Sequence, residues 1–297
     1  MKVSICITTF NEEKSINKLL DSLFSQTKLA NEIIIVDGGS TDKTIELISK
    51  AWGASRVKKF KKIKLIISKG ASIAKGRNLA IKNSKYEIIA MTDGGCICDK
   101  YWLAKITEPF KKDINVVAGF YEMTGKSDFQ KALKPYLGVM PNQFDDETFL
   151  PSARSIAFRK SVWKKVGGFN EKLDRAGEDT DFNLKILKKN FQIARAKKAI
   201  VDWEVPETLL AAMKKFFYYA RGDAQIGGLT KHNIKVVTIF LRYILFFIFW
   251  LLFPIYLIWS TYKHRKYTKN WRQKIYTAII QVASDISIMA GFLNGLL

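Results

Sequence analysis

Short apolar runs alternate with amphipathic segments through the first 120 residues, and this alternation limits the chain to a small set of folds. Each run has the length of a strand, and each is followed by a stretch with the 3.6-residue periodicity of a helix. Strands and helices that alternate in this way form a parallel sheet with helices on its faces. We therefore predict an α/β fold with a mostly parallel central sheet and flanking helices. The apolar runs are VSICIT (3–8), IIIV (33–36), KLII (64–67) and EIIAMT (87–92).

The pattern loosens between about residues 120 and 150. Pro135, Pro141 and the acidic residues 145–147 interrupt the periodicity there. Prolines and clustered acids are typical of irregular connections, so we expect a long loop or flap in this region.

The last 65 residues have a different character. Residues 236–259 form an apolar run that is long enough at helical rise to cross a bilayer, interrupted by Arg242 and Pro254. A basic segment, KHRKYTKNWRQK, contains six Lys or Arg and leads into a weaker apolar segment that contains Asp285. We predict a globular domain over residues 1–232 and a membrane-associated tail over 233–297, with about two helices at 236–259 and 275–297.

The charges of this tail constrain its topology. One complete span after a cytosolic domain would place the basic segment outside, against the tendency of basic loops to remain on the cytosolic side. We favour a re-entrant or interfacial helical pair, bent at Pro254, which keeps the basic segment on cytosolic headgroups. A two-span hairpin is the alternative.

The net charge is strongly positive. The chain has 49 Lys and Arg against 27 Asp and Glu, a formal charge of +22, which favours nucleic acid, anionic lipid or phosphorylated substrates as partners. The basic run RVKKFKKIK at 56–64 has a single aromatic residue, no recognition motif around it, and a strand directly after it. We interpret this run as a solvated lysine-rich surface and expect no nucleic-acid partner.

The cysteines and the N-terminus both indicate the cytosol. Cys6, Cys96 and Cys98 are an odd set without a zinc-ligand spacing, so we expect reduced thiols. The segment MKVSICITTF is too short and unflanked for a signal peptide, so the first domain is expected to face the cytoplasm.

Polar residues follow three of the predicted strands directly. In open α/β sheets ligands bind beyond the carboxyl ends of the strands, which makes such residues candidates for function. Asp37 precedes two glycines that allow close approach by a ligand, and its carboxylate suits a base or ribose. Asp93 suits a hard divalent cation, which itself bridges phosphates. The alternative for Asp37 is a strand-to-helix turn with good capping chemistry, and the alternative for Asp93 is a turn aspartate.

Five strings of residues then carry a family resemblance. They occur in the order and at the spacing of the inverting glycosyltransferases of family 2, and they cover residues 1 to about 230. The chain resembles that family, which implies a transferase with the GT-A nucleotide-sugar-binding fold and its Rossmann-like sheet. The apolar tail adds the expected membrane association. The strings are ITTFNEE, VDGGSTDKT, SKGASIAKGRNLAI, MTDGG and GEDTDFNLKI.

The resemblance assigns roles position by position. It implies that Asp179 is the general base, supported by Glu178, and that Asp93 is the metal ligand for Mn²⁺ or Mg²⁺. The implied donor nucleotide-binding residues are Thr8, Glu12, Asp37, Arg77, Asn78 and Asp93.

Two positions depart from the family pattern. Gly95 stands where many relatives have the second aspartate of an Asp-x-Asp element, which puts the metal site in doubt. Gly38 replaces a common second aspartate after Asp37 and weakens the nucleotide assignment.

The resemblance and the tail together define the expected reaction. A positioned base takes the proton of an acceptor hydroxyl while the nucleotide diphosphate leaves from the opposite side, which inverts the anomeric carbon. The donor would be a UDP- or GDP-sugar, and the acceptor a glycan or lipid-linked glycan at the membrane. A polyprenyl-phosphate sugar synthase and an inactive membrane scaffold with the same fold are the alternatives.

Overall fold

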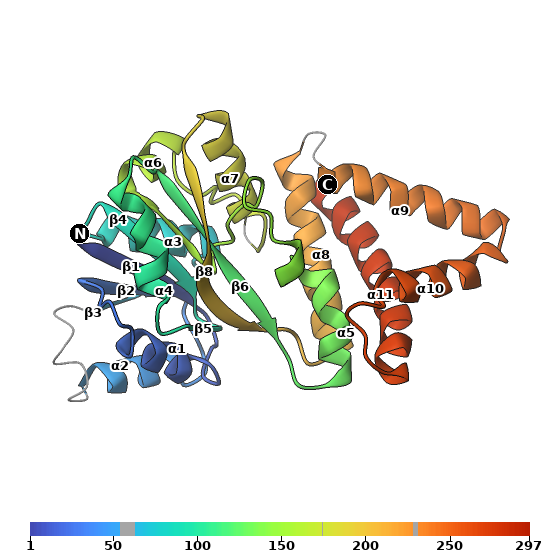
Figure 1. Cartoon of the computed structure of the whole chain (residues 1–297), viewed down its shortest axis with the longest axis horizontal. Helices are drawn as coiled ribbons and strands as arrows, with labels where there is room; N and C mark the ends of the chain where they lie inside the picture. Colours follow the sequence, from blue (N-terminus) through green and yellow to red (C-terminus); the bar gives the residue numbers. More distant parts are fainter. Residues whose placement is uncertain (54–62, 174, 228–230) are drawn as a thin grey trace. The chain divides into compact units, whose positions relative to one another are not determined.

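The computed structural model describes residues 1–53, 63–173, 175–227 and 231–297 (Figure 1). Most of the basic run at 56–64 lies outside these residues, and so does the prediction made for it. By contacts between Cα positions the chain divides into two compact units. Unit 1 comprises residues 1–122, 144–174 and 178–203, and unit 2 comprises residues 123–143, 175–177 and 204–297.

Unit 1 is built on the four predicted strands. They pair in parallel in the order β3-β2-β1-β4, which confirms the reading of the four apolar runs. The side chains of β1, β2 and β4 are almost all buried because both faces of a parallel sheet are covered, whereas those of the edge strand β3 are mostly partly exposed. The strands are β1 (Val3–Thr9), β2 (Glu32–Asp37), β3 (Ile63–Ile67) and β4 (Ile88–Asp93).

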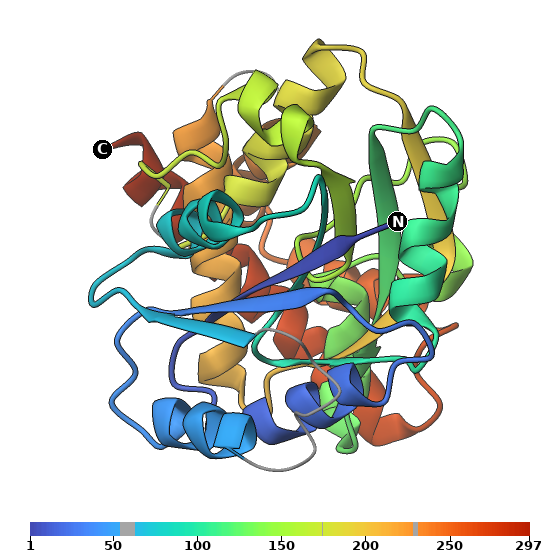
Figure 2. The same ribbon diagram turned by 90° about the vertical axis from the view of Figure 1, so that its left-hand side faces the viewer.

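Helices cover both faces of these strands. In two views α1 and α2 lie on one side of β1–β3, while α3 lies on the other (Figure 1 and Figure 2). Right-handed crossovers require this arrangement, because the chain moves outward from β1 to β3 and then returns to β4 beyond β1. The helices are α1 (Ile16–Phe24), α2 (Thr44–Gly53) and α3 (Ile73–Asn83).

The other half of the eight-stranded sheet contains three antiparallel strand pairs. Strand β7 runs antiparallel to β4 and to β6, and β5 runs antiparallel to β8. The sheet is therefore mixed, and the expectation of a mostly parallel sheet holds for its first half. These strands are β5 (Cys96–Cys98), β6 (Val116–Thr124), β7 (Ile156–Arg159) and β8 (Ile193–Glu204), with helices α4 (Trp102–Thr107), α6 (Lys160–Val166) and α7 (Glu178–Lys188) and the short turn η2 (Glu108–Lys111) between them.

The expected loop between residues 120 and 150 is ordered secondary structure as far as Leu137, where that prediction was wrong, whereas residues 138–155 are irregular apart from one short turn. It contains the end of β6, then α5 (Asp128–Leu137) and the short turn η3 (Pro141–Gln143). Ser127 and Gln130 form a capping box that starts α5. Pro135 lies near the end of α5, where little helix remains to be disrupted, so it did not mark a loop.

The C-terminal tail has three helices where two were predicted. The run 236–259 is divided into α9 (Lys231–Ile248) and α10 (Leu252–Lys263), followed by α11 (Trp271–Leu296). The break has a physical cause, since a proline ring clashes with the carbonyl four residues earlier, here that of Trp250. Pro254 instead occupies the first turn of α10, where its missing N–H costs nothing.

Helix α11 is the core helix of unit 2. It packs against α8 (Leu209–Ile226) so closely that a Cβ on Gly291 would lie 2.1 Å from the carbonyl oxygen of Phe217. Helix α8, which was assigned to the first domain, thus groups with the C-terminal helices. Among the described residues, α11 is the one helix that is long and apolar enough to cross a membrane, and 44% of its most apolar window is buried within the protein.

Candidate active site

The ends of three parallel strands meet at one edge of the sheet. The register pairs Thr8 with Asp93 and Thr9 with Asp37, so the polar residues that follow β1, β2 and β4 are neighbours. Ligand sites of open α/β sheets lie at this edge.

Asp37 organises the turn after β2. Its carboxylate is fully buried and accepts four hydrogen bonds, so its acceptor positions are all used. The donors are Thr9 Oγ1 (2.9 Å), the backbone N–H groups of Gly39 (2.9 Å) and Ser40 (2.7 Å), and Ser40 Oγ (2.7 Å). Asp37, which was predicted to contact the nucleobase of the donor, therefore holds the Gly38–Ser40 loop in place.

Gly38 has a steric explanation. A Cβ at this position would lie 3.3 Å from Cδ2 of Phe10, whose ring is 55% exposed. This contact is tighter than ordinary van der Waals contact, so an aspartate at position 38 would require Phe10 to move by a few tenths of an ångström.

Arg77 connects two of the predicted functional positions. Its Nη2 donates to Asp93 Oδ1 at 2.9 Å, and its Nη1 forms an ion pair with Glu178 Oε1. The guanidinium is 2% exposed. The structure thus brings the predicted metal ligand and the predicted acid pair to one place.

Burial and charge act together on this cluster. Burial opposes the positive charge of Arg77, but Asp93 and Glu178 outweigh it and raise the pKa of the guanidinium. Burial likewise raises the pKa of the Glu178 carboxyl, with Arg77 acting in the opposite direction. Glu178 Oε2 is buried and has no hydrogen-bond partner within the described part of the chain.

Asn78 faces a different part of the protein. Its Oδ1 accepts from Trp163 Nε1 and from the backbone N–H of Phe169, each at 2.9 Å. Its Nδ2 donates to the carbonyl oxygen of Phe169 and to Glu171. The amide therefore fixes the loop after α6, and the structure does not bring it to the Arg77 cluster.

Asp179 is partly exposed at the start of α7, next to the buried Glu178. Ser152 Oγ donates to Asp179 Oδ2 at 3.4 Å and accepts from Arg154 Nη1 at 3.0 Å. The Arg154 guanidinium lies over the rings of Trp203 (4.0 Å) and Tyr121 (5.2 Å). Aromatic faces on a guanidinium restrict its motion, so Ser152 and Asp179 lie beside a fixed cation.

Glu12 lies over the position of the missing second aspartate. A Cβ on Gly95 would be 3.3 Å from Oε1 and 3.4 Å from Oε2 of Glu12. Ser15 Oγ donates to the same carboxylate. A carboxylate is therefore present beside Gly95, although it comes from the loop after β1.

The carboxylates of Asp93 and Glu12 are chemically suited to bind a divalent cation. Carboxylate oxygens are the ligands of Mg²⁺ and Mn²⁺, and such ions are commonly held by one or two carboxylates together with substrate phosphates. Asp93 and Glu12 provide that number. Within the described ranges no group of three His, Cys, Asp or Glu could hold a metal by itself.

Comparison with known families decides the identity of the chain. Residues 4–167 match the model of glycosyl transferase family 2, and residues 115–293 match that of glycosyl transferase family group 2. The chain belongs to glycosyl transferase family 2. The predicted family is thereby confirmed.

Curated relatives of this family 2 glycosyltransferase are distant in sequence. The poly-β-1,6-N-acetyl-D-glucosamine synthase of Staphylococcus epidermidis is 24% identical over 233 residues, which cover 75% of this chain and 55% of the synthase. Glycosyltransferase AglE of Haloferax volcanii is 24% identical over 252 residues, covering 79% of this chain and 77% of AglE. The chain thus spans about half the length of the synthase.

Solved structures support the predicted GT-A fold. TarS of Staphylococcus aureus (residues 1–349, in complex with UDP) has a TM-score of 0.52 at 24% identity, covering 76% of this chain and 69% of that chain. The mannosyltransferase PcManGT of Pyrobaculum calidifontis, in complex with GDP-Man and Mn²⁺, has a TM-score of 0.58 at 14% identity, covering 99% and 73%.

Sequence reasoning missed Arg154 and the position of Glu12 beside Gly95. No local pattern marks Arg154, because its aromatic partners lie 33 residues before it and 49 residues after it in the chain. The sequence signal for Glu12 was the glycine at position 95, which leaves room for a carboxylate from elsewhere in the chain. That signal becomes informative only when the position of the loop after β1 is known.

Proposed function

We propose that this chain transfers a sugar from a nucleoside-diphosphate sugar to an acceptor hydroxyl, with inversion at the anomeric carbon and with Asp179 as general base. The observation that carries the proposal is the bridge from Asp93 through Arg77 to Glu178. It joins the strand ends, where donors bind in this fold class, to the start of α7, where the base would act.

Asp179 has the properties that the base requires. It is partly exposed, whereas its neighbour Glu178 is buried and paired with Arg77. The two acids thus take different roles, with Asp179 receiving the hydroxyl proton and Glu178 holding the cluster together. Proton transfer to a positioned base contributes about 10²- to 10⁴-fold to a rate.

The loops after β1 and β2 form the donor side of the proposed site. Asn11 Oδ1 accepts from the backbone N–H of Thr41 at 2.9 Å, and Ser40 Oγ accepts from that of Asn11 at 2.8 Å. These contacts connect the two loops, while Asp37 holds the second one internally. In our proposal Thr8 and the ordered Gly38–Ser40 backbone face the nucleotide, with Phe10 beside them.

A divalent cation would be held by Asp93 and Glu12. When bound, it would neutralise charge on the departing diphosphate, as Mg²⁺ and Mn²⁺ do in phosphate chemistry. Arg77 keeps Asp93 in position, and Ser15 does the same for Glu12.

The acceptor is proposed to be a glycan or lipid-linked glycan at the membrane, with unit 1 facing the cytoplasm. The net charge of +22 and the exposed apolar side chains of unit 2 support this location. A polyprenyl-phosphate acceptor is the second candidate. A phosphate needs little deprotonation, so a role for Asp179 as an essential base favours a sugar hydroxyl.

The first test is thermal unfolding of the full chain with UDP, GDP, dTDP or CMP, each with and without Mn²⁺ or Mg²⁺. Ligand at about a hundredfold its Kd adds roughly 2.7 kcal/mol of stability. We expect a metal-dependent shift with one nucleoside diphosphate, and no shift with a control oligonucleotide. Stability that no nucleotide changes would favour an inactive scaffold.

The second test separates Asp179 from its neighbours. Asp179→Asn should abolish sugar transfer and leave the nucleotide-induced shift intact, because the base contacts the acceptor rather than the donor. Asp181→Asn is the matched control, since Asp181 lies on the same turn of α7 and pairs with Lys185 at 2.7 Å. Full transfer by Asp179→Asn would show that another group is the base.

A further inference from the structure

The α9 and α10 helices form a hairpin with an unusual surface. Its tip consists of Phe247–Leu252, in which every side chain is apolar and exposed, Phe247 to 92% and Trp250 to 71%. Figure 1 shows the two helices as arms that meet at this tip. Exposed apolar patches of this kind mark interaction sites, because soluble surfaces rarely keep them.

Both arms continue the apolar surface away from the tip. The exposed residues recur at helical spacing and so form one stripe on each arm. The stripe on α9 comprises Ile234, Val237, Leu241, Ile244, Leu245 and Ile248, and that on α10 comprises Leu252, Ile255, Ile258, Trp259 and Tyr262.

Charge is absent from the tip and concentrated at the ends of the arms and in the segment that follows α10. Lys235 lies near the start of α9, and exposed basic residues follow from the end of α10. They are Lys263, Arg265, Lys266, Lys269, Arg272 and Lys274. The surface thus changes from apolar to basic along the hairpin, which is the order of layers in an anionic leaflet, from acyl chains to headgroups.

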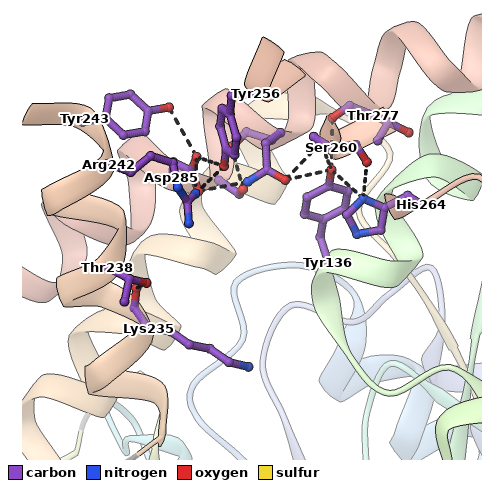
Figure 3. A network of polar contacts seen from close by, with 12 residues as sticks. Tyr136, Lys235, Thr238, Arg242, Tyr243, Tyr256, Ser260, His264, Thr277 and Asp285 are labelled. Carbon is purple, nitrogen blue, oxygen red and sulfur yellow. Dashed lines mark hydrogen bonds and ion pairs between the residues drawn. The ribbon is translucent and has the colours of Figure 1, made fainter. Parts of the chain in front are cut away.

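Arg242 is the charged residue within the arms, and its charge is compensated. It donates to Tyr256 Oη at 2.6 Å, lies over the Tyr256 ring at 4.7 Å, and is 3.9 Å from Asp285 Oδ2 on α11. Asp285 is 2% exposed and accepts from Tyr256 (2.6 Å) and Gln281 (3.0 Å). Figure 3 shows this network, which joins α9, α10 and α11 and removes the one charge that would oppose burial of the arms.

The dimensions of the hairpin correspond to half a bilayer. From Lys235 to Phe247, and from Leu252 to Lys263, each arm has about 12 residues, or about 18 Å at helical rise. The hydrocarbon core is about 30 Å thick, so one leaflet contributes about 15 Å. Each arm therefore reaches from headgroups to the middle of the bilayer and no further.

We propose that the α9–α10 hairpin inserts tip-first into one leaflet of an anionic membrane. The basic residues at the opposite end of the hairpin then contact the lipid headgroups. This inference rests on the membrane location proposed above and specifies how the chain reaches it. Helix α11 stays packed on α8 through Gly291 and Gly295 and does not cross the bilayer. The basic segment then remains on the same side of the membrane as unit 1, which resolves the topological conflict seen in the sequence.

The test uses the full chain and vesicles of phosphatidylcholine with or without 30% phosphatidylglycerol. We expect flotation with the anionic vesicles, and at least tenfold weaker binding for the double variant Phe247→Asp, Trp250→Asp. Leu210→Asp on α8 is the matched control, since Leu210 is 64% exposed outside the hairpin and its replacement should leave binding unchanged. The variant residues are all exposed, so the variants should fold, and the nucleotide-induced thermal shift verifies this.

Depth distinguishes one leaflet from a complete span. The three native cysteines are buried, so a fluorophore can be attached to Trp250→Cys or Trp259→Cys alone. Spin-labelled lipids should place the label at 250 near the bilayer centre and that at 259 closer to the headgroups. A label at 250 located at the opposite surface would overturn the proposal in favour of a span.

Two further outcomes would also overturn it. One is a wild-type chain that dimerises without lipid and becomes monomeric in the tip variant, because the partner would then be a second copy. The other is flotation that the tip variant retains. Failure of sugar transfer alone leaves the proposal standing, since vesicle binding and label depth are measured without donor or acceptor.

Discussion

The guanidinium of Arg77 is ion-paired with Glu178, a residue 101 positions later in the chain. The same guanidinium holds Asp93 at 2.9 Å. One buried cation thus pairs with one oxygen of each of two carboxylates, which come from the end of β4 and the start of α7. This connection joins the metal ligand proposed at Asp93 to the acid pair that opens α7.

Replacing Arg77 should therefore damage stability as well as function. Arg77→Met leaves two carboxylates without their cation, and breaking a buried pair in this way costs about 3–5 kcal/mol. We expect a lower midpoint of urea unfolding and loss of nucleotide binding. Lys75→Met on the same helix is the control, because Lys75 is exposed. A stable Arg77→Met variant that binds nucleotide would show that the bridge is dispensable.

The contacts of Arg77 also show where sequence reasoning ends. The apolar runs identified β1 to β4 because burial of both faces leaves a continuous apolar signature. The same logic placed Asp37 and Asp93 at one edge of the sheet. It could not show that Arg77 pairs with Asp93 and Glu178, since those contacts depend on how α3 and α7 pack on the sheet.

Helices in the C-terminal half were harder to delimit for a related reason. The run 236–259 is apolar on both sides of residue 250 and its one charge, Arg242, lies well before that position, so hydropathy alone could not locate the break before α10. Pro254 predicts a bend within one helix, but in the structure it lies in the first turn of a second helix, α10. Asp285 was noted in the sequence, yet its partners Tyr256 and Arg242 come from other helices.

Glu12 should be needed for metal binding. Glu12→Gln keeps the shape of the side chain and the neighbouring Ser15 but removes a charged oxygen ligand. We expect Mn²⁺ to bind at least tenfold more weakly in the presence of UDP, a scale seen even for residues behind the ligands of a metal. Electron paramagnetic resonance of free Mn²⁺ measures this without turnover.

The control for Glu12 is the adjacent acid. Glu13 is exposed and accepts from the backbone N–H of Lys43 at 3.2 Å, so Glu13→Gln should bind Mn²⁺ normally. Equal Mn²⁺ affinity in Glu12→Gln and the wild type would remove Glu12 from the site and leave Asp93 as the protein ligand.

The three thiols should be inert while the chain is folded. Burial raises the pKa of Cys96 from 9.0 to about 12, with Asp93 acting in the same direction, and burial raises the pKa of Cys6 and Cys98 as well. Because the thiolate is the reactive form, Ellman's reagent should label no cysteine at pH 8 until urea unfolds the chain. Labelling of the folded chain would contradict this burial.

The raised pKa of Cys96 also predicts how the stability of the protein changes with pH. The folded state holds the Cys96 proton more tightly than the unfolded state, so this contribution is complete below pH 9 and is lost as the pH rises toward 12. Cys96→Ala lacks the contribution, and its urea midpoint should therefore fall less steeply than that of the wild type between pH 8 and pH 10.5.

Arg154 should act on catalysis through its position beside Asp179. Its guanidinium, stacked on Trp203 at 4.0 Å, donates to the Ser152 hydroxyl that in turn contacts Asp179. Arg154→Met removes the cation and releases Ser152, so the orientation of Asp179 is lost while the donor loops are unchanged. Small misplacements of reacting groups reduce rates by up to about 10²-fold.

We therefore expect Arg154→Met to lower kcat by about 10- to 100-fold with little change in the donor KM. Arg154→Lys should recover part of that loss, because it restores the charge but not the planar stacking. Arg159→Met is the matched control, since Arg159 also lies over an aromatic ring, Phe110 at 5.7 Å, but contacts the carbonyl oxygen of Ile114 instead of Ser152. If both arginine variants lose stability equally and keep kcat, Arg154 supports the fold and does not position the base.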